Sequence, residues 1–210
     1  VRYEVFPSAA EQFMAGVFYK RIEDPIEYGM ETSGQDTYYT PENFGTAHNM
    51  GVEIDVTKYF RCFGIKANYT YTHSRVTTDK RIMEGSDVKS REQSRPLFGQ
   101  AAHVANLSLL FKQVRLGWEG QLSLSYTGKR LSDISNWYDD DIWEAGYTQL
   151  DASVEKSFKG GFSLFAKAAN LLNTPLLRYI QQGPHTDAVD SPRTDSGNVI
   201  ERKAWHGQSL

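Results

Sequence analysis

The segment HVANLSLLFKQVRLGWEGQLSLSY, residues 103–126, decides the fold because it reads as two alternating β-strands joined by a short turn. Successive side chains of a strand point to opposite faces. The apolar face of the second strand carries Trp118, Gly120, Leu122, Leu124 and Tyr126. Its opposite face is entirely polar. A strand of about ten residues with one apolar face and a ring at each end is typical of the wall of a membrane-spanning β-barrel.

Composition is compatible with such a wall, although the alternation also fits an antiparallel sheet with one face in water. The chain has no run of about 18 apolar residues that could form a membrane helix. Its mean hydropathy of -0.53 still allows a barrel, because half of a barrel wall faces a polar lumen. The net charge of -3, without a basic stripe, argues against a nucleic-acid partner.

Similar alternation recurs along the chain and predicts a series of antiparallel strands. We expect eight strands at residues 1–6, 13–21, 51–57, 63–72, 103–112, 118–127, 147–158 and 162–169, with the start of a ninth at 202–210. Short connections are expected at residues 7–10, 58–61, 112–117 and 159–161, and long, aperiodic loops at 27–40, 77–97, 128–144 and 175–201. Outer-membrane barrels are threaded in this way, with short turns at one edge and long loops at the other.

Three stretches resemble the TonB-dependent outer-membrane receptors, in the C-terminal part of their barrel. Residues 43–53, NFGTAHNMGVE, are similar to the family pattern N-x-G-x-A-x-x-x-G-x-E through Asn43, Gly45, Ala47, Gly51 and Glu53. Residues 170–173, NLLN, resemble the NLF-N/D motif through Asn170 and Asn173. Arg95-Pro96 with His103 and Asn106 resembles the P-x-H-x-x-N segment, although no proline stands two residues before His103.

The resemblance implies an all-β, antiparallel up-and-down transmembrane barrel segment in the cell outer membrane. Receptors of this family take up scarce ligands of the siderophore, cobalamin or glycan class through a plugged, 22-stranded barrel. The implied partners are outer-membrane lipid, a plug domain, the TonB complex and the ligand. We expect residues 1–210 to be one partial barrel domain of about eight to nine strands, with the plug domain and the final strand missing, since the chain begins at Val1 and stops at Leu210.

The cluster of side chains best suited to bind a ligand lies in the third expected loop, between Trp137 and Glu144. Its rings could stack on a sugar, and its carboxylates could bind a cationic or metal-chelate ligand. Binding residues concentrate on loops held by a rigid scaffold. The candidate ligand contacts are therefore Trp137, Tyr138, Asp139, Asp140, Asp141 and Trp143. The alternative is a solvated loop whose tryptophans lie against the barrel rim.

Other chemical motifs are missing from the sequence. The five histidines, His48, His73, His103, His185 and His206, stand at no metal-ligand spacing. Glu53 and Asp55 are both expected to face the lumen, as part of a polar inner wall. There is no nucleophile elbow, P-loop or dinucleotide fingerprint. We therefore expect no metal site, no cofactor and no enzymatic activity.

Two other classes of protein remain open from the residues alone. A passive porin-type barrel would share the alternating strands but lack the plug and the energy coupling. A soluble carbohydrate-binding β-sandwich would pack its apolar rows against each other instead of against lipid.

Overall fold

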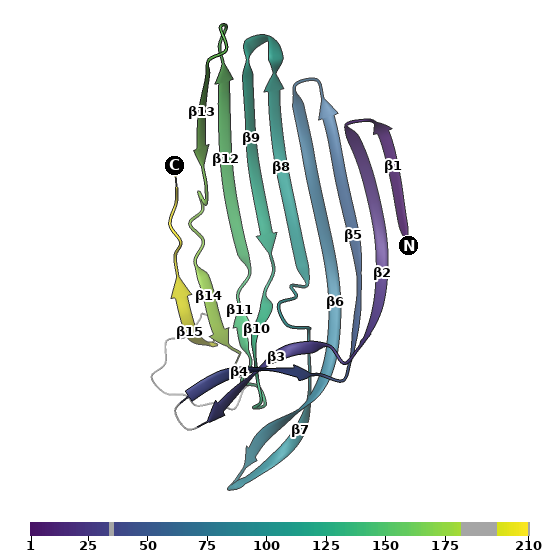
Figure 1. Ribbon diagram of the computed structural model, residues 1–210, viewed down its shortest axis with the longest axis vertical. Helices are drawn as coiled ribbons and strands as arrows, with labels where there is room; N and C mark the ends of the chain where they lie inside the picture. The colour runs from purple at the N-terminus through teal and green to yellow at the C-terminus, as the bar shows by residue number, and fades with distance from the viewer. Residues whose placement is uncertain (34–35, 182–196, 210) are drawn as a thin grey trace.

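A curved antiparallel sheet forms the body of the computed structural model, which describes residues 1–33, 36–181 and 197–209 (Figure 1). Eight strands follow one another in the order β1-β2-β5-β6-β8-β9-β12-β13, and β7 pairs with the far end of β6. Their bounds are Arg2–Ser8, Glu11–Glu23, Thr46–Phe60, Phe63–Glu84, His103–Gln113, Trp118–Thr127, Tyr147–Ser157 and Ser163–Ala168, with β7 at Asp87–Arg95. Strands that are consecutive in the wall are antiparallel neighbours, and the sheet is not closed in this chain. The expected fold class, an all-β segment of an up-and-down barrel, is confirmed.

One face of this sheet is apolar across its width and is uncovered by other described elements. Directly opposite residues of antiparallel strands share a face, and Leu107, paired with Leu124, and Leu109, paired with Leu122, lie in this row. These four leucines are between 37% and 45% exposed. Exposed apolar surface of this extent suits a lipid environment. The described strands place no second sheet over these rows, as a soluble sandwich would need.

The opposite face is polar and is linked from strand to strand by side-chain hydrogen bonds. Asn106 donates to Asn68 at 2.8 Å, and the hydroxyls of Ser108 and Ser123 lie 3.0 Å apart. This is the face expected to line the lumen. Within the described ranges no helix is long and apolar enough to cross a membrane.

Short turns lie together at one end of the sheet, at the top of Figure 1. The connection between β8 and β9 is a single 3-10 turn, Val114–Leu116. The turn after β12 contains Gly160 and Gly161, whose φ values of 98° and 83° favour glycine. The four predicted short connections are therefore present, and the sequence correctly indicated that they share an edge.

The four connections predicted as long, aperiodic loops contain strands, so their prediction as loops was wrong. They hold β3 (Ile26–Ser33), β4 (Asp36–Asn43), the end of β6 with β7, β10 (Arg130–Ser135), β11 (Ile142–Glu144), β14 (Leu176–Ile180) and β15 (Val199–Ala204). These strands lie beyond the wall, where neither face has to meet lipid, so no apolar-polar alternation marks them. Part of the last predicted loop, residues 182–196, lies outside the described residues.

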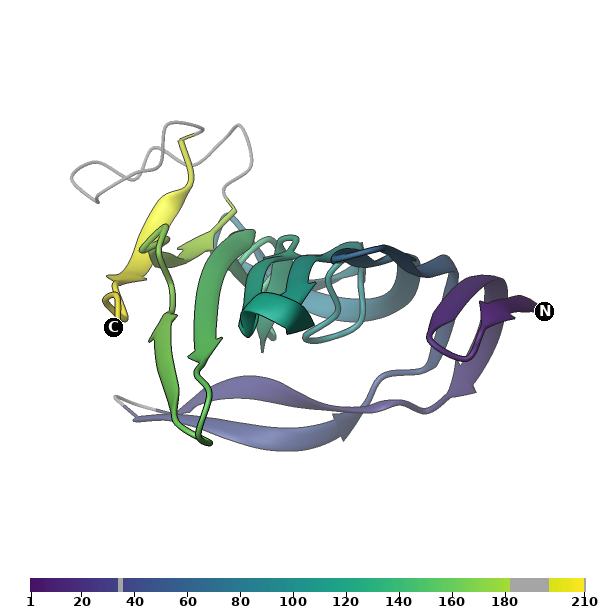
Figure 2. The same ribbon diagram turned by 90° about the horizontal axis from the view of Figure 1, so that it is seen from above.

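The loop-end strands form a second sheet in the order β15-β14-β11-β10-β3-β4. The expected start of a ninth strand at 202–210 corresponds to β15, which ends at Ala204 and pairs with β14; Leu210 lies outside the described residues. Ile134 and Ser135 of β10 pair in parallel with Gly29 and Met30 of β3. The β3–β4 hairpin thus crosses from the β2–β5 side of the wall to β10, as Figure 2 shows from above.

Candidate functional site

A small buried core joins the loop-end sheet to the wall. It consists of Phe44, Ala47, Val76, Leu131 and Ile134, with Ile22, Leu97 and Trp143 packed against it. Ala47 pairs with Val76, and both lie on the same side of the sheet as the polar, lumen-facing residues. Since Leu131 and Ile134 belong to β10, this strand packs on the inner face of β5 and β6. The loop end is therefore folded inward over the lumen side of the wall.

A buried ion pair fixes the β3–β4 hairpin to the end of β7. An Arg95 Nη1 nitrogen lies 2.8 Å from Glu27 Oε2, and the two side chains are only 2% and 7% exposed. Glu27 Oε1 accepts a hydrogen bond from the Phe98 N–H at 2.7 Å. The guanidinium lies over the Phe44 ring, 4.8 Å from its centre. In the described part of the chain Nε and Nη2 of Arg95 have no hydrogen-bond partner. The contacts with Glu27 and Phe44 therefore provide most of the compensation for burying the guanidinium charge.

A second buried pair, between Lys80 of β6 and Asp141, fixes the β10–β11 hairpin. Burial lowers the pKa of Lys80, and the neighbouring Asp141 carboxylate acts in the opposite direction. Asp141 also accepts the Ser135 N–H at 2.9 Å. Burial raises the pKa of the adjacent Asp140, whose carboxylate accepts a hydrogen bond from the Ser135 hydroxyl at 3.2 Å. Two of the three consecutive aspartates thus organise the hairpin turn itself.

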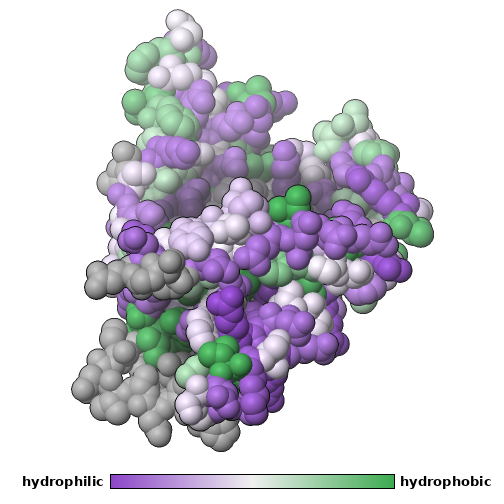
Figure 3. Space-filling view, turned by 60° about the horizontal axis from the view of Figure 1, so that its bottom comes forward, coloured by the Kyte–Doolittle hydropathy of each residue, from purple (hydrophilic) through white to green (hydrophobic). Residues whose placement is uncertain are grey.

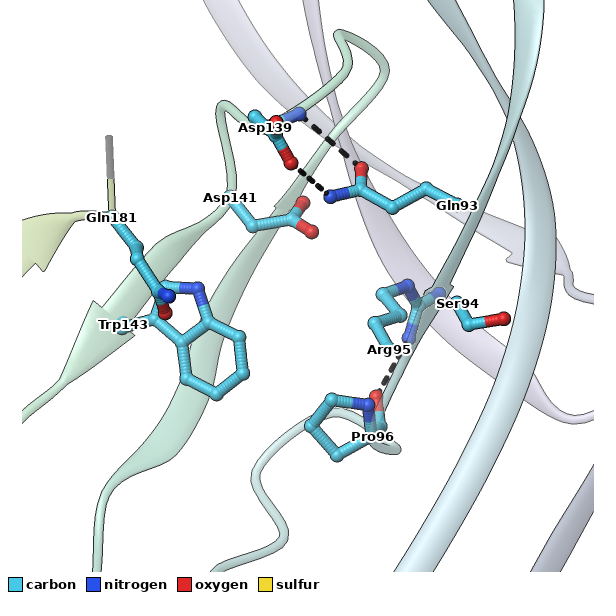
Figure 4. Close-up of a pocket in the computed structure, with 8 residues that line it drawn as sticks. All are labelled: Gln93, Ser94, Arg95, Pro96, Asp139, Asp141, Trp143 and Gln181. Carbon is cyan, nitrogen blue, oxygen red and sulfur yellow. Dashed lines mark hydrogen bonds between the residues drawn. The ribbon is translucent and has the colours of Figure 1, made fainter. Parts of the chain in front are cut away.

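A pocket of about 390 Å³ opens beside this second pair, between β7 and the β10–β11–β14 part of the second sheet. It is lined by Gln93, Ser94, Arg95, Pro96, Asp139, Asp141, Trp143 and Gln181 (Figure 4). Gln93 makes two hydrogen bonds with Asp139, donating to its carboxylate at 2.8 Å and accepting its N–H at 3.3 Å. The lining offers amide, hydroxyl and carboxylate groups beside one indole ring, which suits a small polar ligand.

The structure brings the six candidate ligand contacts to one hairpin but gives them different environments. Trp137 is 38% exposed and forms an isolated bridge with Arg81. Tyr138 lies under the Arg91 guanidinium, 4.7 Å from it. Asp139, Asp141 and Trp143 line the pocket, whereas Asp140 faces Ser135. Figure 3 shows that the described part of the loop end is mainly hydrophilic, with a few hydrophobic patches.

The residues of the family motifs lie mainly at bends and pairing positions. Asn43 ends β4, Gly45 turns the chain with a φ of 55°, and Ala47 is fully buried in the core. Gly51 lets the wall strands approach closely, and Glu53 lies on the lumen face opposite Thr70.

The later motif residues lie in the wall and where β13 ends. His103 begins β8, and Asn106, in the same strand, is hydrogen-bonded to Asn68 on the polar inner face. Asn170 and Asn173 both have positive φ, of 55° and 45°, in the bend between β13 and β14.

The sequence analysis gave no part in the site to Glu27, Lys80, Gln93 or Arg95, although it named Arg95 beside Pro96 in a family-like motif. Each stands in a stretch predicted as an aperiodic loop, where a single charged or amide side chain looks like solvated surface. Their partners lie up to 71 residues away, as for Glu27 and Phe98, so no local signal could have found them. The described residues contain no group of three or more His, Cys, Asp or Glu side chains that could hold a metal ion. His185 lies outside the described residues.

Comparison with known proteins identifies the family. The family model described as TonB dependent receptor-like, beta-barrel, matches residues 2–171. Comparisons with curated proteins and with solved structures gave no significant match. The matched residues cover the whole eight-stranded wall and both hairpins that carry the buried ion pairs. The chain belongs to the TonB-dependent receptor-like β-barrel family.

Proposed function

We propose that this chain forms part of the wall of an outer-membrane receptor that captures a small polar ligand at its loop end and takes part in its active uptake. Family membership supports a receptor and transporter role. The uncovered apolar face supports contact with outer-membrane lipid, and the polar inner face supports contact with a plug domain. Energy from a TonB complex would act through that plug. Siderophore, cobalamin and glycan ligands remain the candidate classes.

The loop-end pocket is the observation that carries this proposal. Its volume of about 390 Å³ is within the range of small-molecule sites. It combines residues from β7, from the β10–β11 hairpin and from the end of β14, so its shape depends on the packing of three loop-end segments. In this proposal the indole of Trp143 supplies contact area, and Gln93 and Asp139 supply hydrogen bonds.

Whole-cell binding tests the pocket. Trp143→Ala and Asp139→Asn in the full-length receptor should weaken binding of the recognised member of a labelled panel, namely a ferric siderophore, cobalamin and an oligosaccharide. Trp205→Ala, a change of an exposed tryptophan near the C-terminus, is the matched control. A cysteine at Asp139 should react with an impermeant reagent on intact cells. Labelling only after permeabilisation would contradict the orientation, and unchanged binding would contradict the assignment of ligand contacts.

The dependence of uptake on TonB distinguishes an active transporter from a passive channel. Accumulation of the recognised ligand should stop in cells that lack TonB, although binding at the cell surface should persist. Uptake that continues without TonB would favour a porin-type function.

A further inference from the structure

Three histidines that are scattered along the sequence come together on the outward face of the wall. The strands β2, β5, β6 and β8 lie side by side (Figure 1). In their register Arg21 stands opposite His48, and His48 stands opposite Arg75. His73 and His103 follow towards β8, opposite Met50 and Tyr71. We call these five exposed residues, Arg21, His48, His73, Arg75 and His103, the outward basic belt.

Tyrosines border the outward basic belt on the side of the apolar rows. The Tyr19 hydroxyl lies 2.8 Å from Nδ1 of His48, and the Tyr69 hydroxyl lies 2.8 Å from Nδ1 of His103. Tyr71 packs on His103, with ring centres 5.1 Å apart. Tyrosines of barrel walls concentrate at the level of the lipid headgroups. The belt therefore lies where the wall leaves the hydrocarbon region, on the loop side.

The belt follows one register row from β2 through β5 to Arg75 of β6, and it extends towards the turn end on β6 and β8. Arg21 and His48 share one register row, His73 is one outward position lower on β6, and His103 is one lower again on β8. The five basic groups thus lie within two outward positions of one another across four neighbouring strands.

Charge balance in the belt favours an anionic partner. Arg21 pairs with Glu23 at 3.3 Å, in an exposed contact. Arg75 donates to the Ser94 hydroxyl from Nε at 3.3 Å and from Nη2 at 3.1 Å, which holds its guanidinium in place. Exposed ion pairs are weak, so Glu23 leaves much of the charge of Arg21 available. When a tyrosine hydroxyl donates to Nδ1 of a histidine, the Nε2–H is left as a donor.

We propose that the outward basic belt binds the phosphate group of an anionic lipid headgroup in the loop-side leaflet. Guanidinium groups bind phosphate oxygens in bidentate geometry, and the histidines add N–H donors. The proposal rests on the proposed membrane placement of the chain, but it is independent of the imported ligand. Its consequence is that lipid fixes the height and tilt of this part of the wall.

A pair of charge-matched variants tests the belt in the full-length receptor. Arg21→Gln with Arg75→Gln removes two charges from the outward faces of β2 and β6. Lys20→Gln with Lys66→Gln removes two charges from the same strands on the inner face, where Lys20 stands opposite Asn49 and Lys66 stands opposite Thr57. Purified receptor is incubated with phosphatidic acid or with phosphatidylcholine of the same acyl chains, and bound lipid is counted by native mass spectrometry.

The unchanged receptor should retain phosphatidic acid in preference to phosphatidylcholine. At about 1 kcal/mol for each basic residue, the belt variant should lose roughly 5- to 30-fold in this preference, whereas the inner-face variant should keep it. Equal losses in both variants, or no preference in the unchanged receptor, would overturn the proposal. So would displacement of the lipid by an equal concentration of inorganic phosphate, which would indicate a general anion site.

Folding is scored separately by the heat-modifiable mobility of the barrel on gels. If the double belt variant does not fold, Arg21→Gln alone should still lower the preference about 5-fold, because this residue is exposed. No change in that folded variant would also count against the belt. Surface binding of the ligand is expected to be unaffected by the belt variants, so a failed lipid result leaves the proposed uptake function standing.

Discussion

Removing the cation of the Arg95–Glu27 pair should open the loop end locally. Arg95→Met keeps much of the side-chain length but leaves the Glu27 carboxylate buried, at 7% exposure, without its positive partner. Loss of one member of a buried pair typically costs about 3–5 kcal/mol, because the remaining charge is uncompensated. A cost of about 3 kcal/mol corresponds to a roughly 100-fold increase in the population of the open form.

Hydrogen exchange of the full-length receptor in lipid nanodiscs measures this opening segment by segment. Amides of β3 and β7 should exchange roughly 100-fold faster in Arg95→Met, while those of β8 and β9 in the wall should be unchanged. Arg95→Met combined with Glu27→Gln should recover part of the protection, since no buried charge remains. Glu92→Gln, an exposed change on β7, is the control. If Arg95→Met accelerates exchange in β3 no more than Glu92→Gln does, the ion pair does not hold the hairpin.

Three further changes test the wall and the hairpin turn. Leu124→Arg on the outward face should cost about 2–4 kcal/mol if this leucine lies near the bilayer midplane, and Ser123→Arg on the inner face much less, as measured by unfolding in lipid; equal costs would contradict the assigned faces. Gly51→Ala should impair barrel assembly on gels, because its Cβ would lie 2.1 Å from a backbone carbonyl oxygen of β6, whereas Gly120→Ala, with a nearest contact of 3.5 Å, should be tolerated. The raised pKa of Asp140 means that the folded hairpin binds its proton more tightly than the unfolded chain, so its stability should fall as pH rises from the ordinary aspartate range through the folded pKa; Asp140→Asn should remove this pH dependence in limited proteolysis of the loop end.

The wall could be predicted from sequence because lipid on one side and a polar lumen on the other impose a period of two. Leu122 and Leu124 alternate with Ser123 and Ser125 for this reason, and the structure has β9 at Trp118–Thr127, as expected. The turn at Gly160 and Gly161 could also be predicted from the sequence, since paired glycines favour short hairpins.

The loop-end strands could not be predicted in the same way. Residues 77–84 continue β6 beyond the apolar rows of the wall, and Thr78, Lys80 and Ile82, which share one face, follow no hydropathy rule. The second half of the hairpin, β7, is made almost entirely of polar residues and is held by backbone pairing with β6. Local propensity is a weak guide where tertiary pairing decides the structure.

The residues between Trp137 and Trp143 have different structural roles, which the sequence alone did not separate. These residues lie together at the loop end, but Asp141 forms an ion pair with Lys80 and accepts a hydrogen bond from Ser135. Trp143 partly packs against the core. Only the hairpin geometry reveals that Asp139, with Gln93 from a distant strand, faces the pocket. A ligand that enters there would therefore meet a surface whose shape is set by two buried ion pairs. In this proposal, Glu27→Gln and Lys80→Met, which change the pair members that do not line the pocket, should alter binding through the packing of the loop end.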